Sequence, residues 1–99
     1  MDIFYQTLYI IHKEYQKFLG TKSLVVLRAF IDGYVNREME INPSHQSNFW
    51  KFNNFVASFY NDDINMNWDR ILTAHTKTDE EAFDKFFYLL DKFLEKEPN

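Results

Sequence analysis

The 99-residue sequence predicts a single all-α domain, a compact bundle of about five helices, one of them short, with no sheet. Only two glycines and two prolines occur, so the chain has few of the residues that a many-turned β fold needs. Apolar residues recur at steps of three and four along most of the chain. The nineteen aromatic residues would also suit strands, so the helical periodicity decides the fold class.

The first half of the chain predicts two long helices. The first covers residues 2–19 and is followed by Gly20, which is typical of a helix end. The second covers residues 22–40, with Thr21 or Ser23 as its cap. Gly33 lies inside the second helix at a cost of about 1 kcal/mol relative to alanine, which predicts a close helix contact or a kink. The predicted core faces are Phe4, Leu8, Ile11, Tyr15 and Phe18, then Leu24, Leu27, Ile31, Tyr34 and Val35.

The second half predicts three further helices after the break at Asn42-Pro43-Ser44. They cover about residues 45–60, the short segment 65–75, and residues 79–97. The last begins with a capping box, in which Thr78 accepts from the Glu81 N–H and Glu81 reaches back. Their predicted core faces are Phe49, Phe52, Val56 and Phe59, then Trp68, Ile71, Leu72 and His75, then Ala82, Phe83, Phe86, Phe87, Leu90, Phe93 and Leu94.

Composition excludes several classes of function. The absence of cysteine rules out thiol catalysis and disulfides and fits a cytoplasmic protein. The net charge of −4 lies wholly in residues 51–99, and an acidic surface repels phosphate backbones, so we expect no nucleic acid partner. No apolar run approaches the roughly 18 residues of a membrane span, so we expect no membrane partner either.

The sequence carries no recognisable catalytic or metal-binding motif. The three histidines, His12, His45 and His75, lack the spacing of a zinc site. Residues 63–67 match the start of a calcium loop, but Trp68 stands where the loop needs glycine and Ala74 where it needs glutamate. We therefore expect no metal, no cofactor and no enzymatic activity.

Four blocks stand in a fixed order in the second half of the chain. They are Phe52-Asn53-Asn54-Phe55-Val56, Tyr60-Asn61, Asn67-Trp68-Asp69-Arg70-Ile71 and Asp79-Glu80-Glu81-Ala82-Phe83-Asp84-Lys85-Phe86-Phe87-Tyr88-Leu89-Leu90-Asp91-Lys92-Phe93, with Gly33-Tyr34 and Arg37 upstream. This order resembles a known family, the small helical bacterial immunity proteins, which accompany polymorphic toxins, including those of contact-dependent growth inhibition systems. The resemblance covers about residues 30–95 and implies a cytosolic protein that binds a cognate toxin domain, often a nuclease, without catalysis or cofactor.

The predicted partner site lies on the acidic surface around the turn at residues 61–63. Loops between rigid helices favour binding residues, and carboxylates beside an aromatic side chain suit a basic toxin domain. A second location is formed by Glu38, Glu40 and His45, around the other long loop. The alternative functions are a small antitoxin or transcriptional regulator and a protein-interaction adaptor. The predicted site residues are Tyr60, Asp62, Asp63, Asp69, Asp79 and Glu80.

Overall fold

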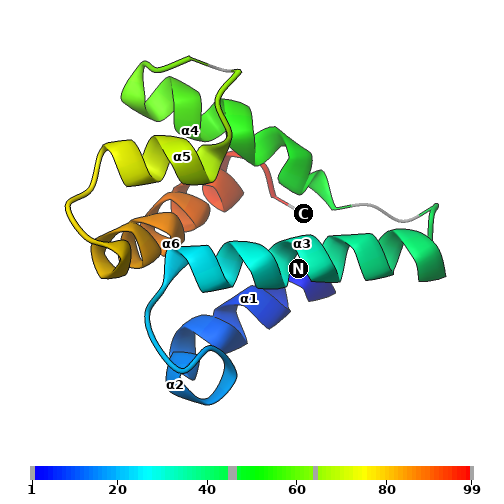
Figure 1. The fold of residues 1–99 in the computed structure, drawn as a ribbon. Coiled ribbons are helices and arrows are strands. Elements are labelled where there is room, and N and C mark those ends of the chain that lie inside the picture. Colours follow the sequence, from blue (N-terminus) through cyan, green and yellow to red (C-terminus); the bar gives the residue numbers. More distant parts are fainter. Residues whose placement is uncertain (1, 45–46, 64, 99) are drawn as a thin grey trace.

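The computed structural model describes residues 2–44, 47–63 and 65–98, and within these ranges the protein is all-α with no strand (Figure 1). The fold class predicted from the sequence is therefore confirmed, although the helix boundaries differ in several places. The elements in chain order are α1 (Ile3–Lys13), α2 (Tyr15–Phe18), α3 (Leu24–Ile41), the 3-10 turn η1 (Asn48–Lys51), α4 (Phe52–Tyr60), α5 (Trp68–Ala74) and α6 (Asp79–Lys96).

The first predicted helix is interrupted at Glu14, whose backbone leaves the helical region. Asp2 caps α1 by accepting a hydrogen bond from the Phe4 N–H at 2.9 Å. The break turns α2 away from the line of α1, so the predicted core residue Phe18 is exposed. Gly20 has a positive φ of 79°, as a helix-ending glycine should.

Two side chains, those of Ser23 and Asp79, cap the N-terminus of helix α3. The Ser23 hydroxyl accepts from the Val26 N–H at 3.2 Å, as one of the two predicted caps. The Asp79 carboxylate, from the first turn of α6, accepts from the Leu24 N–H at 2.8 Å and from the Ser23 hydroxyl at 2.5 Å. One side chain therefore ties the starts of α3 and α6 together.

The prediction that Gly33 marks a close contact or a kink is wrong. Helix α3 runs through Gly33 without interruption, and a Cβ added there would meet no atom within 4 Å. The glycine therefore sits in a regular helix with open space beside it.

The middle of the chain is less helical than its periodicity suggests. Residues 45 and 46, the start of the third predicted helix, lie outside the described residues, and α4 begins at Phe52 after η1. Helix α5 begins at Trp68 rather than near residue 65. Asn53 holds this segment, since its side-chain oxygen accepts from the Trp68 N–H at 2.6 Å and its amide donates to the Met66 carbonyl at 2.8 Å.

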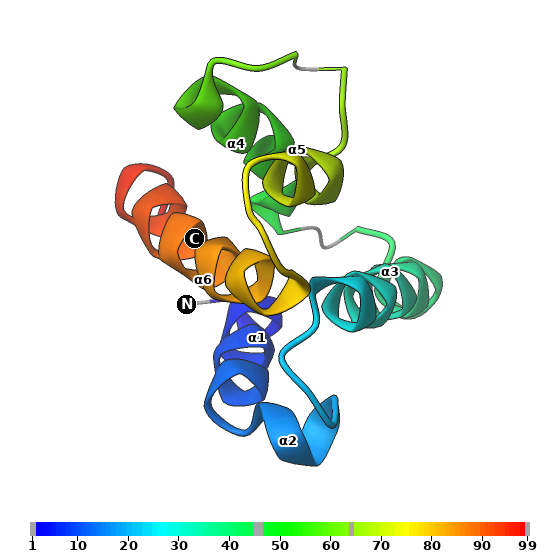
Figure 2. The same ribbon diagram turned by 60° about the vertical axis from the view of Figure 1, so that its left-hand side comes forward.

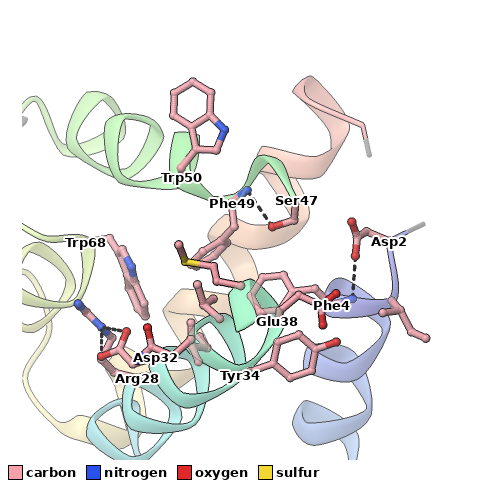
Figure 3. Close-up of a pocket in the computed structure, with 15 residues that line it drawn as sticks. Asp2, Phe4, Arg28, Asp32, Tyr34, Glu38, Ser47, Phe49, Trp50 and Trp68 are labelled. Atoms are coloured by element: carbon pink, nitrogen blue, oxygen red, sulfur yellow. Dashed lines mark hydrogen bonds and ion pairs between the residues drawn. The ribbon is translucent and has the colours of Figure 1, made fainter. Parts of the chain in front are cut away.

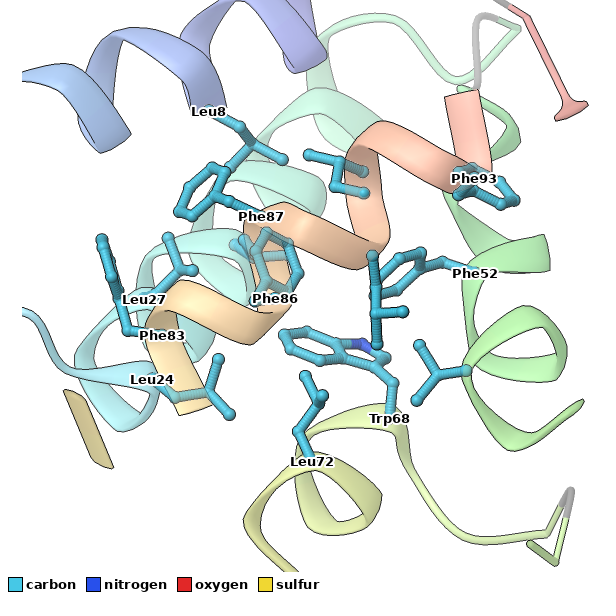
Figure 4. Close-up of a cluster of buried hydrophobic side chains, with 14 of the residues drawn as sticks. Leu8, Leu24, Leu27, Phe52, Trp68, Leu72, Phe83, Phe86, Phe87 and Phe93 are labelled. Carbon is cyan, nitrogen blue, oxygen red and sulfur yellow. The ribbon is translucent and has the colours of Figure 1, made fainter. Parts of the chain in front are cut away.

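Helix α6 lies at the centre of the core, with α1, α3, α4 and α5 around it (Figures 2 and 4). Its Phe86 packs against Phe52 and Trp68, with ring centroids 5.3 and 5.0 Å apart. The predicted capping box forms in part, because Thr78 accepts from the Glu81 N–H but the Glu81 carboxylate takes the Lys77 N–H. Four predicted core residues, Phe18, Val35, Phe59 and His75, are exposed, whereas Tyr5 and Leu89 are fully buried without having been predicted.

Candidate functional site

Tyr60, at the end of α4, does not project as a free aromatic side chain. Its ring stacks on that of His75, the residue after α5, with centroids 4.1 Å apart and an angle of 11° between the planes. Its hydroxyl oxygen is buried and has no hydrogen-bond partner among the described residues. Burial raises the pKa of the Tyr60 hydroxyl, and the nearby charge of Glu81 adds to this effect. Tyr60 therefore fastens α4 to the end of α5.

The turn after α4 is organised by its own carboxylates. Asn61 adopts the left-handed conformation with φ 54° and ends the helix. The Asp62 carboxylate lies 3.0 Å from His75 Nε2, and this partner, together with the Asp63 N–H, lowers the pKa of Asp62. The Asp63 carboxylate accepts from the Asn65 N–H at 2.9 Å. Both acids thus have local structural partners in addition to their exposed surface.

The other predicted site residues are directed at different neighbours. Asp69 forms an ion pair with Arg28 of α3, and Asp79 caps the start of α3. Glu80 is exposed on the first turn of α6. The structure brings Tyr60 and Asp62 together around His75, but the carboxylates of Asp69 and Asp79 face α3 instead.

A larger feature lies along α3, where a groove of about 530 Å³ opens between α3, the start of α1, η1 and the start of α5 (Figure 3). This volume is within the usual range of about 300–1,000 Å³ for binding pockets. Phe49 reaches into the groove from η1, and its ring packs on Phe4 at 5.2 Å and on Trp68 at 5.9 Å. The further apolar residues of the lining are Ile3, Ile31, Tyr34, Val35, Met39 and Trp50.

The charged residues of the groove are mostly acidic. Asp2, Asp32 and Glu38 contribute three carboxylates, against the single guanidinium of Arg28. That guanidinium is already paired, with Asp32 at 3.0 Å and with Asp69. The groove lining therefore has an apolar floor and an excess of negative charge, although the acidic half of the sequence lies elsewhere.

Exposed apolar side chains extend the groove outward along α3 and η1. The Trp50 side chain is 69% exposed and points away from α3, whereas its neighbour Phe49 points toward it (Figure 3). Met39 is 53% exposed, and Ile41, at the end of the same helix, is exposed as well. Aromatic residues and methionine are enriched at protein interfaces, and this surface has that composition.

Sequence reasoning missed this groove because it treated every apolar residue at helical spacing as core. A signal was available within α3, because the buried stripe that ends at Ile31 would continue at Glu38, which is charged. Val35 and Met39 follow Ile31 at steps of four on the same helical face, but they lie beyond the last buried residue of that stripe. Of the second predicted location, Glu38 lines the groove, Glu40 pairs with Arg37 at 3.4 Å, and His45 lies outside the described residues.

The described residues contain neither a metal site nor a membrane-spanning helix, and no related protein was found. Within residues 2–44, 47–63 and 65–98, no three His, Cys, Asp or Glu side chains converge in a way that could hold a metal ion. No helix in that part of the chain is long and apolar enough to cross a membrane. Comparisons with protein-family models, curated protein sequences and solved structures gave no match.

Proposed function

We propose that this protein is a small helical immunity protein that binds and neutralises a cognate bacterial toxin domain in the cytoplasm. The single observation that carries the proposal is the groove beside α3, whose floor is apolar, whose charge is acidic and whose margin exposes Trp50 and Met39. An apolar centre with charged residues around it is the usual composition of a protein-binding surface. The resemblance of residues 30–95 to immunity proteins supplies the kind of partner.

The charge of the protein suits a toxin that acts on nucleic acid. A nuclease domain carries basic residues that hold phosphates, and an acidic inhibitor is attracted to that surface before contact. Electrostatic attraction of this kind accelerates association, which matters when free toxin destroys an essential cell component. The apolar contacts then set how slowly the complex dissociates.

The proposal is tested with the protein encoded immediately upstream of this one. Its C-terminal domain is produced in a host cell with and without this chain, and growth and complex formation are measured. We expect the domain alone to stop growth, and co-production of this chain to restore growth and to yield a stable complex in size-exclusion chromatography. An upstream domain that is not toxic, or a toxic one that is neither bound nor neutralised, would contradict the proposed function.

A further inference from the structure

We infer that the groove beside α3 receives an amphipathic, basic α-helix of the partner protein. In this arrangement the apolar face of the helix lies on Phe49, Val35 and Met39, with Trp50 at the margin of the contact, and lysine or arginine side chains face the groove carboxylates. The inference deepens the proposed function by naming the binding element of the partner, and it rests on that function for the partner being a toxin domain.

The length of the groove suits a helix of about three turns. The groove residues of α3 extend from Arg28 to Met39, a distance of about 16 Å at 1.5 Å per residue. A partner helix of about eleven residues covers the same distance and presents apolar side chains at positions i, i+3, i+4 and i+7.

The backbone of the groove favours a helix over an extended segment. An extended peptide gains affinity by adding a strand to an open sheet edge, and the described residues contain no strand. The wall of the groove is α3, an uninterrupted helix whose interior backbone groups are bonded to one another. A partner segment must therefore satisfy its own backbone groups, as a helix does.

The charge of the groove selects a basic partner and disfavours a second copy of this chain. Glu38 forms no ion pair or hydrogen bond through its side chain among the described residues, and it lies beside Phe4 and Tyr34 (Figure 3). If two copies packed groove to groove, the same carboxylates would meet across the interface. Like charges placed together in an interface are costly, whereas lysine or arginine would find partners there.

Synthetic helical peptides of about 14 residues, long enough to cover the groove, test the inference on the intact protein. The first peptide carries leucine on one face and lysine elsewhere. The second replaces every lysine with glutamate, and the third has the composition of the first in an order that scatters the leucines around the helix. Binding is followed by titration calorimetry and by the fluorescence of Trp50, which is the exposed one of the two tryptophans.

We expect the leucine–lysine peptide to bind at least about tenfold more tightly than either control peptide, since both the apolar face and the charge contribute. Its binding should shift the fluorescence of Trp50 to shorter wavelength. In the variants Trp50→Ala and Met39→Ser the affinity should fall by about fivefold or more. Glu38→Gln should lower it by about twofold to fivefold and should reduce its dependence on salt.

Two matched variants control for general effects. Val25→Ala changes another exposed apolar residue of α3, 73% exposed and outside the groove lining, and Glu95→Gln removes one exposed charge near the end of α6. Both should bind the leucine–lysine peptide within about twofold of the unchanged protein, because neither residue faces the groove. Circular dichroism checks that every variant keeps its helical content.

The inference is overturned if no peptide binds, if the glutamate peptide binds as well as the lysine peptide, or if the groove variants behave like the two controls. Self-association that disappears in Trp50→Ala would assign the groove to a second copy instead. These outcomes are separate from the failure of the proposed function. If the protein neutralises the toxin domain but binds no peptide, the proposed function holds and the inference about the groove fails. If it binds the peptide but neutralises no toxin, the inference about the groove holds and the proposed function fails.

Discussion

Helices α3 and α6 have the same length, 18 residues, but they use their apolar residues differently. Helix α6 buries seven residues, spread over its length from Ala82 to Phe93. Helix α3 buries only Leu24, Leu27 and Ile31, all in its first half. The second half of α3 still carries Val35, Met39 and Ile41, and these are exposed.

The positions of the two helices explain this difference. Helix α6 has other helices around it, whereas the second half of α3 extends beyond them toward the edge of the molecule (Figures 1 and 2). A helix that only had to remain hydrated there would carry polar residues on its outer face. We propose that the apolar residues at this edge bind the partner, and stability measurements can separate a binding role from a role in the fold.

The largest expected effect is on the core helix. Phe86 is fully buried and packs on Phe52 and Trp68, so Phe86→Ala should lower the free energy of unfolding by about 3–5 kcal/mol. Met39→Ala should change it by less than about 0.5 kcal/mol, since the side chain is largely exposed. Urea unfolding followed by far-UV circular dichroism measures both. Equal losses in the two variants would mean that the second half of α3 belongs to the core.

The link between the two helices should have a smaller but clear effect. Asp79→Ala removes the hydrogen bonds to the Leu24 N–H and to the Ser23 hydroxyl, and should cost about 1–2 kcal/mol in urea unfolding. Glu80→Gln, one residue along, provides the matched control and should cost less than about 0.5 kcal/mol. If the two variants were equally stable, the cap of α3 would not depend on α6.

A stabilising change is expected in the second half of α3. Gly33→Ala should raise the free energy of unfolding by about 0.5–1 kcal/mol, because alanine favours the helix and the added Cβ meets no atom within 4 Å. Thermal unfolding would show it as a higher midpoint. A destabilised variant would indicate that this face of α3 is packed, contrary to the comparison with α6.

The smallest effect concerns a histidine that packs on α6. The His12 ring stacks on Phe87 with centroids 4.0 Å apart, and burial lowers its pKa from the usual 6.5, although Asp84 and Asp91 act in the opposite direction. A lowered pKa means that His12 binds a proton less readily in the folded state than in the unfolded state. The contribution of neutral His12 to the stability of the fold is therefore complete above about pH 6.5, and it is lost as the pH falls through the pKa of the folded state.

His12→Gln removes this titration. Between pH 7.5 and 5.5 the unchanged protein should therefore lose more stability than the variant, as measured by urea unfolding at each pH. The comparison cancels the other titrating groups, which both proteins share. Parallel losses in the two proteins would show that His12 titrates alike in the folded and unfolded states.

The periodicity of the sequence was enough to predict the helices and most of the core. Apolar residues three or four positions apart, such as Leu24, Leu27 and Ile31 or Phe83 and Phe86, share one face of a helix, and that face is buried. Local chemistry was also enough for the Ser23 and Thr78 caps. Spacing cannot show where a helix runs past its neighbours, so Val35 was assigned to the core although it is exposed.

The predicted site shows the same limit. The acids of the second half stand out in composition, but a carboxylate's partners depend on tertiary contacts that composition does not contain. Asp69 pairs with Arg28 and Asp79 caps Leu24, across 41 and 55 residues of sequence respectively. The groove is lined by residues from four separate segments of the chain, so no local sequence motif could predict it.

The central claim is tested most directly with the proposed toxin partner, by comparing the binding kinetics of two double variants at several salt concentrations. One carries Met39→Ser with Trp50→Ala in the groove, and the other carries Asp62→Asn with Asp63→Asn in the acidic turn. We expect the groove variant to dissociate at least about tenfold faster, with the turn variant changed by less than about threefold in either rate. Slower, less salt-dependent association of the turn variant, with the groove variant unchanged, would place the toxin on the turn and contradict the account.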